Sequence, residues 1–325
     1  MNEFTVSLED SVCATALGGA QGQNLRLLEK AFHVQVVLRG SDLVVQGTLE
    51  DIEKLRGLIR MLAPLWKKGS SISSEEMEYA IELSTQDHSY PDLLSTLFSK
   101  EHLFITAKGR PIAPKTLQQK KYIECIEKGK ITFGIGPAGT GKTFLALTMA
   151  VKALRNKEVA RIILTRPVVE AGEHLGFLPG DVQAKVNPYF RPLYDALYDL
   201  LDLEKAQKLV EKNIIEIAPL AYMRGRTLND AFIILDEGQN TLYSQIKMFL
   251  TRLGQNSRMV ITGDITQVDL PLGKESGLLP MRDVLGKIDG IGFIFFTEQD
   301  VLRSSLVRKM VGAFQSYEKR KKQKG

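Results

Sequence analysis

Eight residues near the middle of the chain constrain its fold most strongly. Residues 136–143 read Gly-Pro-Ala-Gly-Thr-Gly-Lys-Thr and fit the pattern G-x-x-x-x-G-K-[ST]. Apolar residues 131–135 before them predict a short buried strand, and residues 144–151 after them predict a helix. Glycines let such a loop turn its N–H groups inward, and the helix N-terminus adds a positive dipole. The order strand, loop and helix therefore predicts a phosphate-binding P-loop, with a chance glycine-rich turn as the alternative.

The P-loop pattern assigns a role to each part of the loop. Lys142 is expected to reach the β- and γ-phosphates of ATP, and Thr143 to place its hydroxyl on Mg²⁺. The backbone of the other residues is expected to surround the phosphates: Gly136, Pro137, Ala138, Gly139, Thr140 and Gly141.

Two further predicted strands end in polar residues that suit the same chemistry. Residues 232–235 are apolar and lead into Asp236 and Glu237. This is typical of a Walker B element, in which Asp236 holds the hydration shell of Mg²⁺ and Glu237 orients or deprotonates the attacking water. The alternative is a buried strand that happens to end in two surface acids.

The third strand, residues 258–262, leads into Asp264 and Gln267. It should end at the same edge of the sheet as the other two, which would let both side chains sense the γ-phosphate or the water. A polar turn is the alternative.

From about residue 113 onward, predicted helices alternate with apolar segments that predict strands. The strands are expected at residues 131–135, 161–165, 214–218, 231–235, 258–262 and 292–296. Apolar strands separated by helices predict an α/β fold of the P-loop NTPase type, with a parallel sheet covered by helices on both faces.

Residues 1–70 predict a smaller α/β domain in front of this sheet. A strand (4–8) and a helix (10–17) are followed by a GxxG turn, a helix, two strands (34–38 and 43–47) and a helix from about 49 to 62. This order resembles a KH domain, in which the GxxG loop clamps single-stranded nucleic acid. The resemblance implies RNA binding by Gly19, Ala20, Gln21 and Gly22. Because Gln21 gives the loop no positive charge, a domain used for packing or assembly is the alternative.

Composition and pattern divide the chain into four parts. We expect a KH-like domain at 1–70, a connecting segment at 71–112, an ATPase domain at 113–315 and a basic tail at 316–325. The connecting segment contains a predicted helix at 74–83, a strand at 104–107 and a turn at 108–111.

The bulk composition is that of a soluble globular protein. Charged residues make up 25% of the 325 residues, and no apolar segment approaches the roughly 20 residues that span a bilayer. The first residues do not form a signal peptide, so we expect a cytoplasmic protein. Cys13 and Cys125 match no metal or redox spacing and are expected to be small buried residues.

The net charge of +5 and the isoelectric point near 9.0 permit a nucleic-acid partner without requiring one. Part of the excess lies in the tail, which is expected to be a solvated segment. Contact with a phosphate backbone is the alternative for the tail.

The order of the motifs resembles that of superfamily 1 helicase-like ATPases and, more narrowly, that of the PhoH-like family. The resemblance covers most of residues 113–315 and is carried by G-x-x-x-x-G-K-T, D-E-x-Q, G-D-x-x-Q and the segments 164–180, 219–228 and 247–254. Gly238 stands where the family usually has Ala, and Ser304 where it usually has His. A small residue is kept at position 238, whereas Ser304 puts any role of the histidine in doubt here.

The resemblance implies an ATP-hydrolysing motor or switch that acts on RNA, with a ribonuclease as a possible second partner. A single ATPase core implies self-assembly into a ring in which a neighbour completes the site. The alternative is a nucleotide-gated RNA-binding or assembly factor that unwinds nothing.

Two residue roles follow from the same resemblance. Arginines stabilise phosphoryl transfer in such enzymes, and we favour Arg303 over the other candidates, which are Arg166, Arg224 and Arg226. Gln119 resembles a glutamine that reads the edge of adenine, with Gln118 as its rival.

Overall fold

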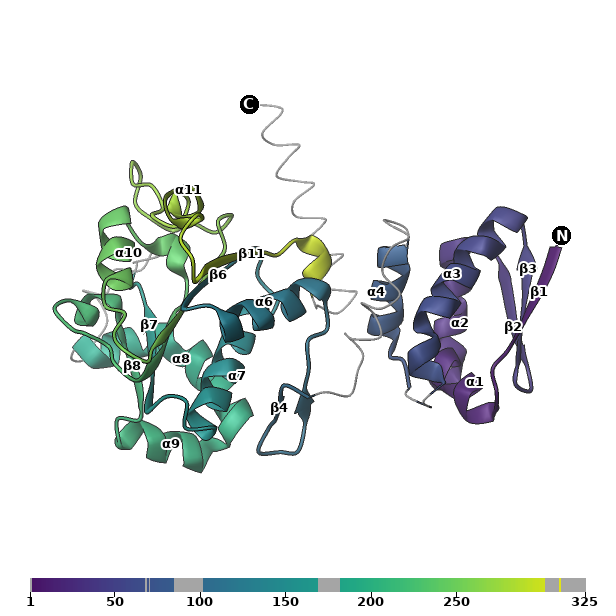
Figure 1. Ribbon diagram of the computed structural model, residues 1–325, viewed down its shortest axis with the longest axis horizontal. Helices are drawn as coiled ribbons and strands as arrows, with labels where there is room; N and C mark the ends of the chain where they lie inside the picture. The colour runs from purple at the N-terminus through teal and green to yellow at the C-terminus, as the bar shows by residue number, and fades with distance from the viewer. Residues whose placement is uncertain are drawn as a thin grey trace. The chain divides into compact units, whose positions relative to one another are not determined.

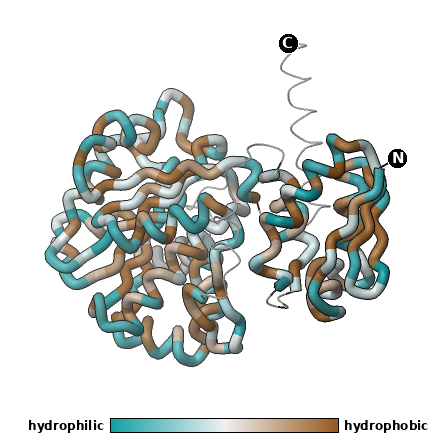
Figure 2. Tube along the Cα trace, turned by 45° about the vertical axis from the view of Figure 1, so that its right-hand side comes forward, coloured by the Kyte–Doolittle hydropathy of each residue, from teal (hydrophilic) through white to brown (hydrophobic). Residues whose placement is uncertain are grey.

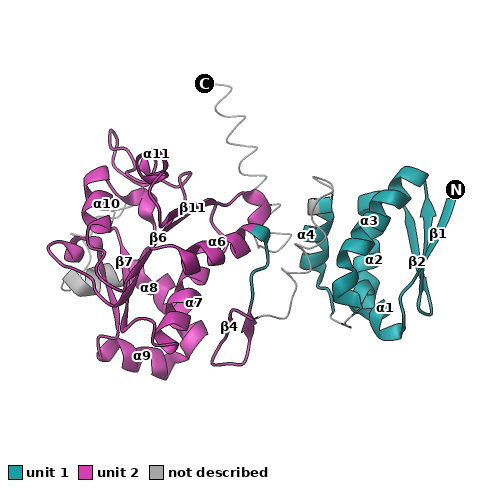
Figure 3. Cartoon of the chain, viewed as in Figure 1, with its two compact units in different colours: residues 1–101, 113–117 teal, residues 102–112, 118–325 magenta. Residues whose placement is uncertain are grey.

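The computed structural model describes residues 2–67, 69, 71–84, 102–168, 182–301 and 310. The chain divides into two compact units (Figure 3). The first comprises residues 1–101 with 113–117, and the second comprises residues 102–112 with 118–325.

The first unit has the element order that its sequence predicts. Its three strands form an antiparallel sheet in the order β1-β3-β2 (Figure 1). The elements are β1 (Asn2–Ser7), α1 (Ser11–Gly18), η1 (Ala20–Gly22), α2 (Gln23–Phe32), β2 (Gln35–Arg39), β3 (Asp42–Gly47) and α3 (Leu49–Trp66).

Capping side chains start two of these helices. The Asp10 carboxylate accepts a hydrogen bond from the backbone N–H of Cys13 at 2.7 Å. Thr48 accepts one from the N–H of Asp51 at 3.2 Å. Each bond satisfies a backbone donor that the first turn of a helix leaves unpaired.

Helix α4 (Ser74–Ser84) is the last helix that the structure describes within residues 1–84 of the first unit. It is the helix predicted in the connecting segment, and it packs against α2 and α3. Met77 and Ala80 of α4 are fully buried in the same apolar cluster as Leu28 and Leu62.

The second unit is built on a six-stranded parallel sheet, which confirms the predicted fold class. The strands lie in the order β11-β6-β10-β9-β7-β8 and are largely apolar (Figure 2). Each begins and ends within one residue of its predicted bounds: β6 (Ile131–Ile135), β7 (Arg161–Arg166), β8 (Ile215–Pro219), β9 (Ala231–Leu235), β10 (Arg258–Gly263) and β11 (Ile291–Phe295).

Helices and short turns precede, connect and follow these strands, and those between two strands form the crossovers that parallel pairing requires. They are α6 (Leu117–Lys128), α7 (Lys142–Arg155), α8 (Val182–Leu201), α9 (Leu203–Glu211), η3 (Leu220–Met223), η4 (Gly238–Asn240), α10 (Tyr243–Leu250), α11 (Met281–Leu285) and η5 (Glu298–Asp300). Among the described residues, no helix is long and apolar enough to cross a membrane.

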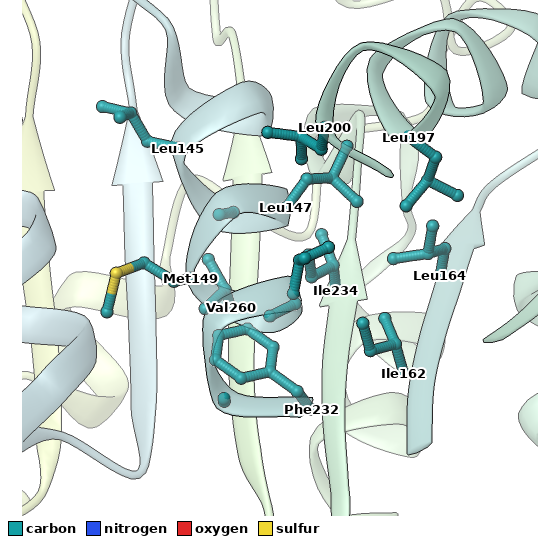
Figure 4. Close-up of a cluster of buried hydrophobic side chains, with 14 of the residues drawn as sticks. Leu145, Leu147, Met149, Ile162, Leu164, Leu197, Leu200, Phe232, Ile234 and Val260 are labelled. Carbon is teal, nitrogen blue, oxygen red and sulfur yellow. The ribbon is translucent and has the colours of Figure 1, made fainter. Parts of the chain in front are cut away.

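Alternate residues of the strands pack into two apolar clusters, one on each face of the sheet. On β7, Ile162 and Leu164 belong to one cluster and Ile163 to the other. In the first cluster, side chains of α7 and α8 meet those of β7, β9 and β10, with Leu147, Leu197 and Ile234 near its middle (Figure 4). Burial on both faces explains why these strands are apolar without alternation.

Two details differ from the sequence-based expectation. Pro111, expected in a turn, begins the second strand of a hairpin made by β4 (Phe104–Ile105) and β5 (Pro111–Ile112). Cys13 is buried as expected, but Cys125 is only partly buried. It lies near the edge strand β11, where a Cβ on Gly292 would meet its sulfur.

Candidate nucleotide site

The ends of three neighbouring strands gather the predicted site residues at one edge of the sheet. Strand β10 lies between β6 and β9, with Gly263 opposite Ile135 and Ile261 opposite Leu235. The segments that follow these strands carry the P-loop, Asp236 and Asp264, so the sheet order brings them together.

The P-loop adopts a backbone that needs its glycines. Gly136 has φ +152°, and Gly141, just before α7, has φ +82°. A Cβ at Gly136 would lie 2.5 Å from the carbonyl oxygen of Phe296, and a Cβ at Gly141 would lie 3.1 Å from Nε2 of Gln119. Side chains at these positions would therefore strain the loop and collide with its surroundings.

Lys142 lies inside the loop, with 8% of the residue exposed. Its Nζ donates to the carbonyl oxygens of Gly136 (2.6 Å) and Pro137 (2.7 Å) and to the hydroxyl of Thr140 (3.2 Å). Burial lowers the pKa of this ammonium from its ordinary value of 10.5, although nearby carboxylates act in the opposite direction.

Oxygen atoms suited to Mg²⁺ lie beside Lys142. The hydroxyls of Thr143 and Thr262 each donate to Oδ1 of the buried Asp236 at 2.7 Å. Mg²⁺ in nucleotide sites is held by one or two carboxylates together with phosphates and water. The described residues hold no cluster of three or more His, Cys, Asp and Glu that could bind a metal. Thr143 and Asp236 supply the hydroxyl and the carboxylate that such a site takes from the protein.

Glu237 follows Asp236 and is held from two sides. Its Oε1 lies 2.7 Å from Nη2 of Arg166, and its Oε2 accepts a hydrogen bond from Nε2 of Gln239 at 2.6 Å. The same Arg166 nitrogen lies 3.2 Å from Oδ2 of Asp236. The Glu237 backbone is left-handed, with φ +56°, and 37% of its side chain is exposed. Its carboxylate can therefore reach solvent at the mouth of the site.

The segment after β10 joins this network. Oδ2 of Asp264 accepts from the P-loop N–H of Ala138 at 3.0 Å, while Oδ1 accepts from the N–H and hydroxyl of Thr266. Gln239 accepts from the N–H of Asp264 at 2.9 Å and donates to the carbonyl oxygen of Gln267 at 3.0 Å. One buried glutamine thus links the segments after β9 and β10.

These groups surround one cavity of about 290 Å³. It contains all the residues predicted for catalysis except Arg303, which lies outside the described residues. The cavity is lined by Ala138, Gly139, Gly141, Lys142, Thr143, Phe144, Asp236, Glu237, Thr262, Gly263, Asp264 and Gln267.

The structure distinguishes the two glutamines proposed to read adenine. Gln119 is 3% exposed, and its Nε2 donates to the carbonyl oxygen of Thr140 in the P-loop at 3.0 Å. Gln118 instead donates to the carbonyl oxygen of Phe295. Only Gln119 of the two contacts the P-loop.

The other arginine candidates occupy different places. Arg226, expected as a candidate for the site, forms a bidentate ion pair with Glu216 of β8, at 2.6 and 2.7 Å. Its guanidinium is therefore bound to β8 and not to the carboxylates of the site. Arg224 is exposed beyond η3. Arg166 is the candidate that contacts the carboxylates of the site.

The GxxG loop of the first unit forms a single tight turn. Gly19 and Gly22 both have φ +70°, and Gln21 has φ +52°. A Cβ at Gly19 would lie 2.8 Å from the side-chain nitrogen of the buried Asn24. This glycine therefore allows α1 and α2 to approach closely at the loop.

Two residues of the site, Thr262 and Gln239, were not predicted from the sequence. Thr262 is the last residue but one of β10, and Gln239 follows Glu237 by two positions in D-E-x-Q. The available signal was their position just before or after a strand's carboxyl end. Their partners depend on the order of strands, which the sequence pattern does not contain.

Comparison with known proteins places the chain among relatives of one kind. The family model described as "PhoH-like protein" matches residues 111–315. A PhoH-like protein of Bacillus subtilis is 48% identical over 301 residues, which is 93% of each chain. A PhoH-like protein of Synechocystis is 45% identical over 317 residues, covering 97% of this chain and 95% of the relative. Protein PhoH of Escherichia coli K12 is 45% identical over 206 residues, or 63% of this chain and 58% of the relative.

Solved structures give weaker matches. The helicase domain of Hef from Pyrococcus furiosus matches 57% of this chain and 38% of its own, with 16% identity and a TM-score of 0.35. The large terminase of a thermophilic bacteriophage, in complex with ADP, matches 60% of this chain and 48% of its own, with 13% identity and a TM-score of 0.35.

Proposed function

Because this chain belongs to the PhoH-like family and carries a P-loop NTPase fold, we propose that it hydrolyses ATP with Mg²⁺ and couples the hydrolysis to RNA in the cytoplasm. The observation that carries the proposal is the position of Thr143, Asp236 and Glu237. The first two share a 2.7 Å hydrogen bond, and the third extends into the same cavity.

Each residue has a defined task in this proposal. The P-loop N–H groups and Lys142 bind the phosphates, and Gln119 contacts the base. Glu237 orients the attacking water and accepts its proton, with Asp264 and Gln267 beside the γ-phosphate. Thr143 and Asp236 would hold Mg²⁺, which when bound neutralises charge on the β- and γ-phosphate oxygens.

The proposed RNA partner is supported by the first unit. Its element order and GxxG turn resemble those of a KH domain. Single-stranded RNA would contact Gly19, Ala20, Gln21 and Gly22 through its backbone. A ribonuclease partner and assembly of several chains into a ring are part of the same proposal.

One observation favours a second function. The described residues of the second unit contain one parallel sheet, whereas superfamily 1 helicases have two ATPase cores. A chain with one core would serve as a nucleotide-gated RNA-binding or assembly factor without separating strands. A duplex-separation assay distinguishes the two, because only a motor would open a duplex at a rate that depends on Lys142.

The proposal is tested by ATP hydrolysis with and without single-stranded RNA. We expect Lys142→Ala and Glu237→Gln to lose turnover, by at least about 100-fold, while Glu237→Gln still binds ATP because the phosphate cradle is intact. Hydrolysis by Glu237→Gln at the parental rate would remove Glu237 from its proposed role.

A matched pair of variants tests the RNA arm of the same assay. Gln21→Asp places a negative charge in the GxxG turn, and Gln21→Asn is neutral; Asn and Asp both tolerate the left-handed backbone found there. We expect only Gln21→Asp to weaken RNA binding. Equal binding by the two variants would argue against this loop as the RNA site.

A further inference from the structure

Arg166 lies where the ends of two strands meet a helix. It is the last residue of β7, and the N–H of Asp236 donates to the neighbouring carbonyl of Thr165 at 2.9 Å. Its side chain is 15% exposed. Nη2 contacts Asp236 and Glu237, and Nη1 donates to the carbonyl oxygen of Tyr189 in α8 at 2.5 Å.

In this arrangement both oxygens of Glu237 are engaged. Oε1 is paired with Arg166 and Oε2 with Gln239. Release of the bond to Arg166 would free an acceptor site on Oε1 of Glu237 for the attacking water. Gln239 is neutral and also bonds the backbone of Asp264 and Gln267, whereas Arg166 carries the positive charge that attracts a phosphate.

One hydrogen-bond donor of Arg166, its Nε–H group, is not used within the described part of the chain. Its Nε is buried and has no hydrogen-bond partner among the described residues. A guanidinium binds phosphate oxygens and carboxylates through the same planar fork, so Arg166 is able to exchange one for the other.

The charges around the cavity favour this exchange. Its lining residues include one cation, Lys142, and three carboxylates, Asp236, Glu237 and Asp264. A nucleoside triphosphate brings further negative charge. A second cation close to the γ-phosphate would offset that charge as it redistributes during phosphoryl transfer.

We propose that Arg166 reads the γ-phosphate within its own subunit and thereby positions Glu237. When a triphosphate binds, one of its γ-oxygens takes an N–H group of Arg166, and Oε1 of Glu237 is released to hold the attacking water. This inference deepens the proposed ATPase function and rests on it. Arg166 is thus the positioning residue in cis, whatever Arg303 does.

The test compares binding of a triphosphate with binding of a diphosphate. Dissociation constants of the full chain with Mg²⁺ are measured by calorimetry for ADP and for the non-hydrolysable β,γ-imido analogue of ATP. We expect the dissociation constant of Arg166→Gln for ADP to lie within about threefold of the parental value. Its preference for the analogue, measured as the ratio of the dissociation constants for ADP and the analogue, should fall about tenfold. Its kcat should fall by on the order of 100- to 1,000-fold, with a smaller change in KM.

Two further variants serve as controls. Arg226→Gln also removes an arginine–carboxylate pair, the one with Glu216, and should leave both the binding preference and kcat unchanged. Arg166→Lys keeps the charge without the planar fork, and we expect it to recover less than about a tenth of the parental kcat.

Several results would overturn the proposal. One is an equal loss of affinity for ADP and the analogue in Arg166→Gln with a lowered melting temperature, which would assign Arg166 to the fold alone. A parental kcat and preference in that variant, or full recovery by Arg166→Lys, would also overturn it. If the parent does not hydrolyse ATP, the proposed function fails, yet the binding preference still tests Arg166.

Discussion

At the scale of single residues, Lys142 shows how burial and charge oppose each other in this site. Its ammonium is hydrogen-bonded to the loop, yet desolvation lowers its pKa below 10.5 in spite of Asp264, Asp236 and Glu237. The charged form is therefore less stable in the folded chain than in the unfolded chain. The position suits phosphate binding rather than stability.

This conflict predicts that the difference in free energy of unfolding between the parent and Lys142→Met depends on pH. Because the lysine pKa is lower in the folded state, the unfolded chain binds more protons between the two pKa values, and parental stability rises with pH there. The destabilisation caused by burying the charged ammonium is fully present below the pKa that Lys142 has in the folded chain, and it vanishes above pH 10.5. Methionine does not titrate. We therefore expect the difference in free energy of unfolding to shift in favour of the parent as pH rises from the lowered folded-state pKa towards 10.5. Urea unfolding followed by circular dichroism would show it, and a constant difference would contradict it.

At the scale of elements, strands were easier to predict than the contacts between their ends. Six apolar segments identify the strands because both faces of the sheet are buried. The sequence also indicates that Thr143 and Asp236 meet, since a P-loop and a Walker B strand imply a shared cation. It does not place β10 between β6 and β9, and this order alone puts Thr262 against Asp236.

Helix α8 shows a similar limit. Pro188 and Pro192 lie inside it, although proline lacks the N–H that a helix interior requires. Leu193, Leu197 and Leu200 of this helix are buried against the sheet. Tertiary packing thus keeps a helix where local sequence favours a break.

The α1–α2 pair around the GxxG turn depends on a buried side chain. The amide nitrogen of Asn24 donates to the carbonyl oxygens of Leu17 (3.0 Å) and Ile72 (2.9 Å). Asn24 is fully buried, and it joins the end of α1 to the segment leading into α4. The loop geometry therefore depends on a contact across 48 residues of sequence.

Asn24→Ala should destabilise the first unit by about 2–3 kcal/mol, because it leaves two buried carbonyl groups without this donor. Trp66, the one tryptophan of the chain, is buried in the core of this unit, so its fluorescence in urea reports on this unit directly. Gln23→Ala is the control, since it removes only the exposed bond from Ser74 and should change stability by less than about 0.5 kcal/mol. Similar urea midpoints for both variants would show that Asn24 is not the anchor.

At the scale of the whole molecule, the two proposed activities belong to different units. The cavity is lined entirely by the second unit, and the GxxG turn belongs to the first. Each unit has an apolar core of its own. If the chain forms the proposed ring, a neighbour can supply an arginine such as Arg303 to the site.

Mixing two inactive variants would decide between a site completed within one chain and a site completed by its neighbour. In a head-to-tail ring, every interface pairs the nucleotide site of one subunit with the same surface of the next. If Arg303 acts across the interface, a one-to-one mixture of Lys142→Ala and Arg303→Ala chains contains sites with an intact lysine and a neighbour's intact arginine. Random assembly would restore roughly a quarter of the parental ATPase activity.

The matched control mixes Lys142→Ala with Arg166→Gln. Both residues lie in the second unit of the same chain. Lys142 lines the cavity, and Arg166 pairs with Asp236 and Glu237, which line it too, so mixing should restore nothing. Activity in this control would place Arg166 in trans and contradict its proposed role. If neither mixture recovers activity, although sedimentation shows mixed rings, the arginine of the neighbour is not part of the site. A fully active monomer in sedimentation would exclude the ring itself.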